Sequence, residues 1–84
     1  MVKDKSFEGT KIITTYNSST INKMVYDTAT NILTVYFTKG NIYEYYDVPH
    51  ETIVKINGAD SSGKTFMTEI KQFTYKKINN DEND

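Results

Sequence analysis

The segment from Gly58 to Thr65 (GADSSGKT) has the residue types and spacing of a phosphate-binding loop, G-x-x-x-x-G-K-T. In nucleotide hydrolases this loop follows a buried strand and opens a long helix. Here a short amphipathic segment precedes it and only 19 residues follow Thr65, so we do not expect nucleotide hydrolysis. Backbone N–H groups at a helix start can nevertheless hold an anion. Ser62, Gly63 and Lys64 are therefore predicted to bind a phosphate, with a plain capped loop as the alternative.

The other residues suited to catalysis or metal binding are isolated along the chain. His50 is the only His and there is no Cys, so a thiolate zinc site and a cysteine nucleophile are both excluded. The carboxylates are scattered and do not follow the spacing of a calcium-binding loop. They include Glu44, Asp47, Glu51, Asp60 and Glu69. We expect no catalytic residues, no metal site and no cofactor, and predict that the protein is not an enzyme.

Aromatic and lysine side chains are the better candidates for binding. Aromatic residues make up 13% of the chain, with seven Tyr and four Phe. Tyr36, Tyr43 and Tyr45 are predicted to stack on bases or other rings. The lysines predicted to meet phosphates are Lys64, Lys71 and Lys76. Both groups also have a plainer interpretation, because cross-strand tyrosines often only stabilise a sheet and lysine clusters are usually solvated faces.

The strands that would carry the tyrosines are indicated by β-branched and aromatic residues. Three strands are predicted, at residues 21–26, 32–38 and 42–48. Residues 1–16 are interpreted as an N-terminal arm, mobile over residues 1–10, with a possible edge strand at residues 11–15 (KIITT).

Two short helices are expected after the strands. Pro49 suits a first helical position and Gly58 a helix end, which predicts one helix between them. A second helix is predicted from Thr65 to about residue 72, and residues 75–78 are predicted to be extended. The expected fold is a small α+β domain: an antiparallel β-meander of three to four strands with two short helices packed on one face.

The expected hairpin register decides where the tyrosines lie. If Phe37 pairs with Ile42, then Tyr36 faces Tyr43 and lies beside Tyr45, because side chains alternate between the two faces of a sheet. The three tyrosines would then share the face away from the helices. The opposite, core-facing set would be Leu33, Val35, Phe37, Ile42, Tyr46 and Val48.

Charge and hydropathy restrict the class of partner. The net charge is −1, there is no Arg, and residues 55–78 hold five Lys against two acids. The absence of Arg weighs against sequence-specific recognition of duplex DNA. Residues 79–84 are predicted to be a disordered acidic tail. No apolar run approaches 18 residues and the N-terminus is polar, which predicts a cytoplasmic protein without a membrane partner.

Many small marks spread over residues 17–78 also resemble the KTSC domain, a bacterial and phage module that some lysyl-tRNA synthetases carry at their C-terminus. The matching marks are Ser18-Ser19, Ile21, Tyr26-Asp27, Val35, Phe37, Gly40, Tyr43-Glu44-Tyr45, Tyr46-Asp47-Val48-Pro49, Ala59, Ser61 or Ser62, Gly63-Lys64, Phe66, Ile70, Phe73 and Tyr75. Phe73 and Thr74 depart from the Tyr and Pro that the family pattern has there. The resemblance implies the fold more than the function, which is not established for the family, although RNA binding has been suggested from the synthetase fusion.

These observations lead to two hypotheses. The first is non-catalytic binding of a nucleotide-type ligand, either single-stranded RNA or a small nucleotide. The Lys-, Asn- and Ile-rich composition without Arg suggests an AT-rich genome, and extends this hypothesis to a phage-encoded protein that sequesters a host signalling nucleotide in the infected cytoplasm. The alternative is a protein-protein interaction module or inhibitor that uses the tyrosine-rich face. We also predict a homo-oligomer, because so small a core is often supplemented by association.

Overall fold

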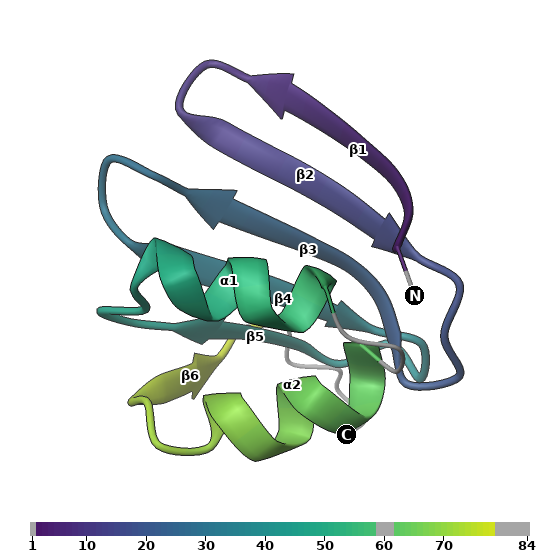
Figure 1. The fold of residues 1–84 in the computed structure, drawn as a ribbon. Coiled ribbons are helices and arrows are strands. Elements are labelled where there is room, and N and C mark those ends of the chain that lie inside the picture. Colours follow the sequence, from purple (N-terminus) through teal and green to yellow (C-terminus); the bar gives the residue numbers. More distant parts are fainter. Residues whose placement is uncertain (1, 59–61, 79–84) are drawn as a thin grey trace.

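The computed structural model describes residues 2–58 and 62–78, which form one antiparallel sheet and two helices (Figure 1). The sheet has six strands in the order β1-β2-β3-β4-β5-β6, so each strand pairs with its neighbours in the chain. The elements are β1 (Val2–Glu8), β2 (Lys11–Tyr16), β3 (Ile21–Asp27), β4 (Ile32–Phe37), β5 (Ile42–Tyr45), α1 (His50–Asn57), α2 (Ser62–Ile70) and β6 (Tyr75–Lys77). The prediction of three to four strands was therefore wrong, although the fold is α+β.

The N-terminal residues account for most of this difference. Residues expected to be a mobile arm form β1, which makes a hairpin with β2 around Gly9, whose φ of 63° suits glycine. β2 pairs with β1 on one side and β3 on the other, so the KIITT segment is an interior strand and not an edge. β1 is exposed along most of its length and carries no hydrophobic alternation, which is the signal that identifies a strand in a sequence. The predicted tail at residues 79–84 lies outside the described residues.

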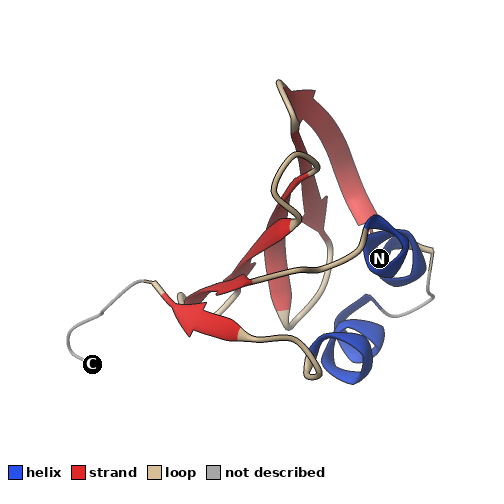
Figure 2. Cartoon of the chain, turned by 90° about the vertical axis from the view of Figure 1, so that its left-hand side faces the viewer, coloured by secondary structure: helices blue, strands red, loops and turns tan. Residues whose placement is uncertain are grey.

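Both helices lie on the same side of the twisted sheet (Figure 2). α1 follows Pro49 and ends at Asn57, and the N–H of the next residue, Gly58, donates to the Val54 carbonyl at 3.0 Å. α2 begins at Ser62, three residues before the predicted start, and ends at Ile70. Among the described residues, neither helix is long and apolar enough to cross a membrane.

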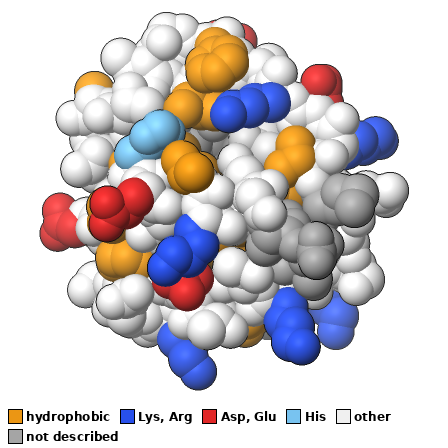
Figure 3. All heavy atoms as spheres, viewed as in Figure 1, with side chains coloured by type: hydrophobic (Ala, Val, Ile, Leu, Met, Phe, Trp, Pro, Cys, Tyr) orange, Lys and Arg blue, Asp and Glu red, His pale blue; other side chains and the backbone are white. Residues whose placement is uncertain are grey.

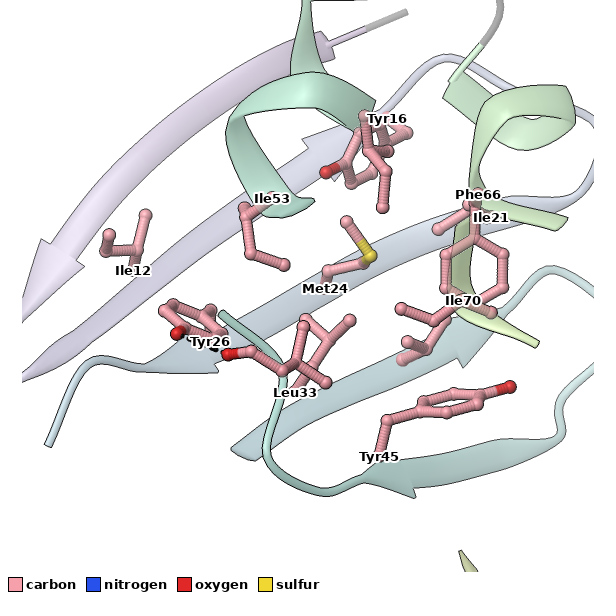
Figure 4. Close-up of a cluster of buried hydrophobic side chains, with 13 residues drawn as sticks. Ile12, Tyr16, Ile21, Met24, Tyr26, Leu33, Tyr45, Ile53, Phe66 and Ile70 are labelled. Carbon is pink, nitrogen blue, oxygen red and sulfur yellow. Dashed lines mark hydrogen bonds between the residues drawn. The ribbon is translucent and has the colours of Figure 1, made fainter. Parts of the chain in front are cut away.

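The core fills the space between the helices and one face of the sheet (Figure 4). β2, β3 and β4 contribute alternate residues, and the helices contribute the apolar stripes predicted from their spacing. The buried residues are Ile12, Tyr16, Ile21, Met24, Tyr26, Leu33, Val35, Tyr45, Val48, Ile53, Ile56, Phe66 and Ile70. Buried tyrosine hydroxyls find partners, as polar groups in a core must: Tyr26 donates to the Val48 carbonyl at 2.7 Å, and Tyr16 donates to the Asn57 side chain.

The β4–β5 hairpin is one residue out of the expected register. Tyr36, not Phe37, pairs with Ile42, and Val35 pairs with Tyr43. The loop is shorter than expected because the Phe37 N–H donates to the Asn41 carbonyl at 2.9 Å. Gly40, with φ of 101°, provides the left-handed turn that a three-residue loop requires. A shift of one residue turns every side chain of β5 to the other face, so Tyr43 and Tyr45 face the helices.

Candidate functional site

A groove opens between α2 and the edge of the sheet formed by β5 and β6. Its volume is about 360 Å³, and its walls come from the β4–β5 hairpin, β5, β6 and the C-terminal half of α2. The groove is lined by Phe37, Asn41, Tyr43, Tyr45, Met67, Ile70, Lys71 and Tyr75. Such a concave, largely apolar surface with a few polar groups is typical of a small-molecule site.

Three tyrosines form one wall of the groove. The sheet register pairs Tyr45 with Tyr75, and Tyr43 lies two residues before Tyr45 on the same face. The ring centroid of Tyr75 lies 5.4 Å from that of Tyr43 and 5.6 Å from that of Tyr45, within the range of aromatic contact. Tyr45 is 7% exposed, whereas Tyr75 is 58% exposed. The wall therefore has a buried base and an outer ring that is open to solvent.

Buried Phe66 fixes the base of this wall from the helix side. Its ring makes edge contacts with Phe37 and Tyr45, at centroid separations of 5.6 and 5.8 Å. Phe37 in turn makes a perpendicular contact with Tyr43 at 5.6 Å. Because every ring touches at least one other, the aromatic lining is held before any ligand arrives, which reduces the entropic cost of binding.

The tyrosine hydroxyl at the base is held protonated. Burial, with smaller contributions from neighbouring Tyr43 and Tyr75, raises the pKa of Tyr45 to about 12. At neutral pH the groove therefore contains no tyrosinate at this position, and Tyr45 can act as a neutral hydrogen-bonding group but not as a general base.

Among the described residues that line the groove, Lys71 is the one with a charged side chain. A second hollow of about 290 Å³ shares Phe37, Asn41 and Met67 with the groove and adds Lys39 together with three hydroxyl side chains, Ser19, Thr20 and Thr38. Figure 3 shows Lys side chains along the lower part of the molecule, where α2 runs in Figure 1. The site therefore combines rings with positive charge, which favours an anionic ligand that has an aromatic part.

The structure brings together only some of the residues predicted from the sequence. Tyr43, Tyr45 and Lys71 all line the groove. Tyr36 lies on the other face of the sheet, where the Lys23 ammonium is 4.4 Å from its ring centroid. Lys76 is also on that face, opposite Glu44. The predicted platform of three tyrosines is therefore wrong, and the one-residue register difference is the reason.

The predicted anion site at the start of α2 is separate from the aromatic groove. Gly63 is buried, and a Cβ there would stand 3.1 Å from the Ser18 hydroxyl oxygen. A side chain there would press on Ser18 and Thr20, so glycine allows α2 to pack closely against the loop before β3. Lys64 is exposed on the next position of the helix, and Ser62 is the first residue of α2. Residues 59–61 of the loop pattern lie outside the described residues, and α1, rather than a strand, precedes the pattern.

Several groove residues were not predicted from the sequence. Asn41, Met67 and Tyr75 were assigned no role, and Phe37 was assigned to the core, whereas it is half-buried in the groove wall. The available signal was the spacing of Phe73 and Tyr75 after the second helix, which suggests a strand but not its partner. Among the described residues no group of three or more His, Asp or Glu side chains is close enough to hold a metal ion.

Comparison with known proteins agrees with the resemblance seen in the sequence. The model of the KTSC domain matches residues 17–75, which are most of the chain. The chain belongs to the KTSC domain family. Both the groove wall and the β4–β5 hairpin that sets its register fall inside this KTSC region.

Two proteins similar to this KTSC domain come from bacteria. An uncharacterized protein from Stutzerimonas stutzeri (strain A1501) is 36% identical over 59 residues, covering 70% of this chain and 83% of the relative. The crystal structure of a KTSC domain protein from Yersinia pestis is similar with a TM-score of 0.71 and 27% identity, and covers 90% of this chain and 97% of that one. The structural similarity therefore extends beyond residues 17–75.

Proposed function

We propose that this KTSC domain binds a nucleotide-type ligand in the groove between α2, β5 and β6. The exposed ring of Tyr75 stacks on the base, and Lys71 contacts a phosphate. The observation that carries the proposal is the combination of a solvent-exposed ring, that of Tyr75, with a lysine, Lys71, in the lining of one groove. No catalytic step is included in this function.

Physical chemistry supports each half of the contact. Stacking of a base on an aromatic side chain contributes about 1–3 kcal/mol and does not depend on the identity of the base. A lysine ammonium binds phosphate as a point charge without demanding a fixed geometry. Lys39, in the adjoining hollow, adds a second positive charge on the same side of the sheet. Tyr36 and Lys76 lie on the opposite face and have no part in this contact.

The opposite face supplies matched controls for a binding experiment. Calorimetry or tyrosine fluorescence should measure the affinity of the wild type for the four ribonucleoside monophosphates and for a short single-stranded RNA. Tyr75→Ala should weaken binding by about 1–3 kcal/mol, that is, roughly 5- to 150-fold. Tyr36→Ala removes the same side chain from the other face and should leave the affinity unchanged. Lys71→Ala and Lys76→Ala form a second pair, in which only the first should weaken binding.

Comparing the affinities for mononucleotides and for the RNA oligomer distinguishes the two kinds of ligand. A preference for mononucleotides fits a protein that sequesters a small nucleotide, whereas a preference for the oligomer fits RNA binding. Affinity that falls equally with Tyr36→Ala and Tyr75→Ala would remove the groove as the site. Failure of both ligand classes to bind the wild type would overturn the proposed function.

A further inference from the structure

The side of the sheet away from the helices carries apolar residues that no other element covers in the described part of the chain (Figure 2). Alternation along β2, β3, β4 and β5 turns these residues outward while their neighbours enter the core. We call this side the open face. Its central residues, all half-buried, are Ile13, Val25, Ile32, Thr34, Tyr36 and Ile42.

The open face has a pattern that is symmetric about its middle. Ser6, Ile13, Val25, Thr34, Glu44 and Lys76 pair successively across the six strands and form one central row. On β3, Val25 of this row is flanked two residues away by Lys23 on one side and Asp27 on the other. On β4, Thr34 is flanked in the same way by Tyr36 and Ile32. The register pairs Lys23 with Tyr36 and Asp27 with Ile32.

We propose that the open face docks against the open face of a second copy of this chain, with a two-fold axis along the central row. Such an axis lies between two stacked sheets and reverses the strand direction, so each strand lies over its own copy. Val25 then meets Val25, Lys23 of each copy meets Asp27 of the other, and Ile32 meets Tyr36. The interface then contains two pairs of opposite charges with apolar contacts between them. This is the self-complementarity that an isologous dimer requires.

The charges at the centre of the open face are already ordered. The Asp27 carboxylate accepts hydrogen bonds from the Ala29 N–H at 2.9 Å and the Thr10 hydroxyl at 2.8 Å. These contacts hold the pKa of Asp27 below its usual value, so its negative charge is present at neutral pH. Lys23 rests over the ring of Tyr36 at 4.4 Å. Both charged side chains have therefore lost part of their conformational freedom before association, which reduces the entropic cost of forming the dimer.

Like charges occur toward both ends of the central row. At the β1 end, Asp4 and Glu8 flank Ser6 on the open face, so Asp4 of one copy would approach Glu8 of the other. At the other end, Glu44 and Lys76 would approach their own copies if the two sheets were flat. Twisted sheets that pack face to face cross at roughly 30° and diverge away from the centre, which separates these outer positions. Glu44 also accepts a hydrogen bond from the Tyr46 hydroxyl at 2.9 Å and pairs with Lys76 in its own sheet. The dimer therefore has an apolar centre and a charged rim, as interfaces commonly do.

The proposal is tested by measuring the mass of the protein in solution. Light scattering and sedimentation at high micromolar concentration should give about twice the monomer mass of 9.7 kDa for the wild type. Val25→Asp places two like charges on the axis and should raise the dissociation constant of the dimer at least about tenfold. Lys5→Glu is the matched control for a charge reversal on the open face such as Lys23→Glu, because Lys5 pairs with Thr14 and therefore lies on the helix side. Its dissociation constant should stay within twofold of the wild type.

A charge exchange tests the predicted contact itself. Lys23→Glu and Asp27→Lys should each be monomeric, since like charges then meet twice in the homodimer. An equimolar mixture of the two should dimerise, because every contact in the mixed dimer again joins opposite charges. A mixture that stays monomeric overturns the proposal, as does a monomeric wild type. Circular dichroism checks folding, and if Asp27→Lys unfolds because its turn contacts are lost, Val25→Asp and Lys23→Glu decide: unchanged dimerisation in both overturns the proposal.

Discussion

At the scale of single residues, the tyrosines of this domain divide into structural and exposed groups according to depth. Tyr16, Tyr26 and Tyr45 are buried, and Tyr75 is mostly exposed. Composition treats all seven as equivalent, although burial decides which ring is available to a ligand and which hydroxyl must stay neutral. Desolvation raises the pKa of each of the three buried tyrosines. The buried phenols therefore contribute to stability only while they are protonated.

Alkaline pH should reveal this contribution for Tyr45. Its pKa is about 12 in the folded protein against 10.0 for an unperturbed tyrosine, so the unfolded chain loses the proton first. The stability that the neutral phenol confers is present below pH 10 and is lost as pH rises from about 10 to 12. The free energy of unfolding, measured in urea at several pH values, should fall over this range. Tyr45→Phe should show a smaller fall than the wild type, and an identical fall would contradict the assignment.

At the scale of elements, one turn determines which surface each tyrosine joins. The β4–β5 hairpin closes through a loop whose left-handed residue is Gly40, and this loop sets the pairing of Val35 with Tyr43. A loop one residue longer would turn Tyr43 and Tyr45 away from the helices and dismantle the groove. The groove is therefore a consequence of hairpin geometry as much as of its aromatic residues.

Substitution of Gly40 should therefore affect both stability and the site. A side chain at φ of 101° is strained, so Gly40→Ala should destabilise the domain by about 1–2 kcal/mol. Thermal or urea unfolding measures this loss, and nucleotide affinity should fall with it because the hairpin positions Tyr43. Lys39→Ala, one residue earlier, is the control for stability. Equal stability of the two variants would show that the loop tolerates a side chain at Gly40.

At the scale of the whole molecule, the two faces of the sheet differ in what covers them, because both helices pack on one side. The helix side contains the core and the groove, and the open face is available for association. β1 closes one edge of this sheet with an exposed, charged strand, VKDKSFE, and three-residue β6 closes the other. Charged or short edge strands are common protection against uncontrolled strand pairing. The dimer proposed here uses a face and not an edge, so both grooves remain accessible on the outside.

Removal of β1 tests its role as an edge strand. A chain that starts at Thr10 should still fold, because β1 side chains are mostly exposed and contribute little to the core. Its melting temperature should drop by several degrees as the backbone hydrogen bonds of the outer hairpin are lost. β2 would become an edge rich in β-branched residues, so time-dependent light scattering should increase. Unchanged scattering would show that β1 does not protect the sheet.

The local features of this protein could be predicted from its residues alone. The strands from Ile21 onward carry β-branched and aromatic residues, Pro49 and Gly58 bound α1, and the spaced marks indicated the KTSC family. These features depend on side-chain type and near neighbours, which are visible in a linear chain. β1 could not be predicted because an exposed edge strand needs no hydrophobic period, and its hydrogen-bonding partner supplies its stability.

Which residues make up the site depends on contacts between elements that are distant in the chain. Tyr43, Tyr45 and Lys71 were predicted for a binding site and do line one groove, whereas Tyr36 and Lys76 are on the other face. The division follows from a single residue of register, which a hairpin loop fixes through a backbone hydrogen bond between Phe37 and Asn41. A sheet alternates with period two, so any error of one residue exchanges its two faces. Tyr75 joins the groove because β6 pairs with β5 across some 30 intervening residues, a contact that no local pattern encodes.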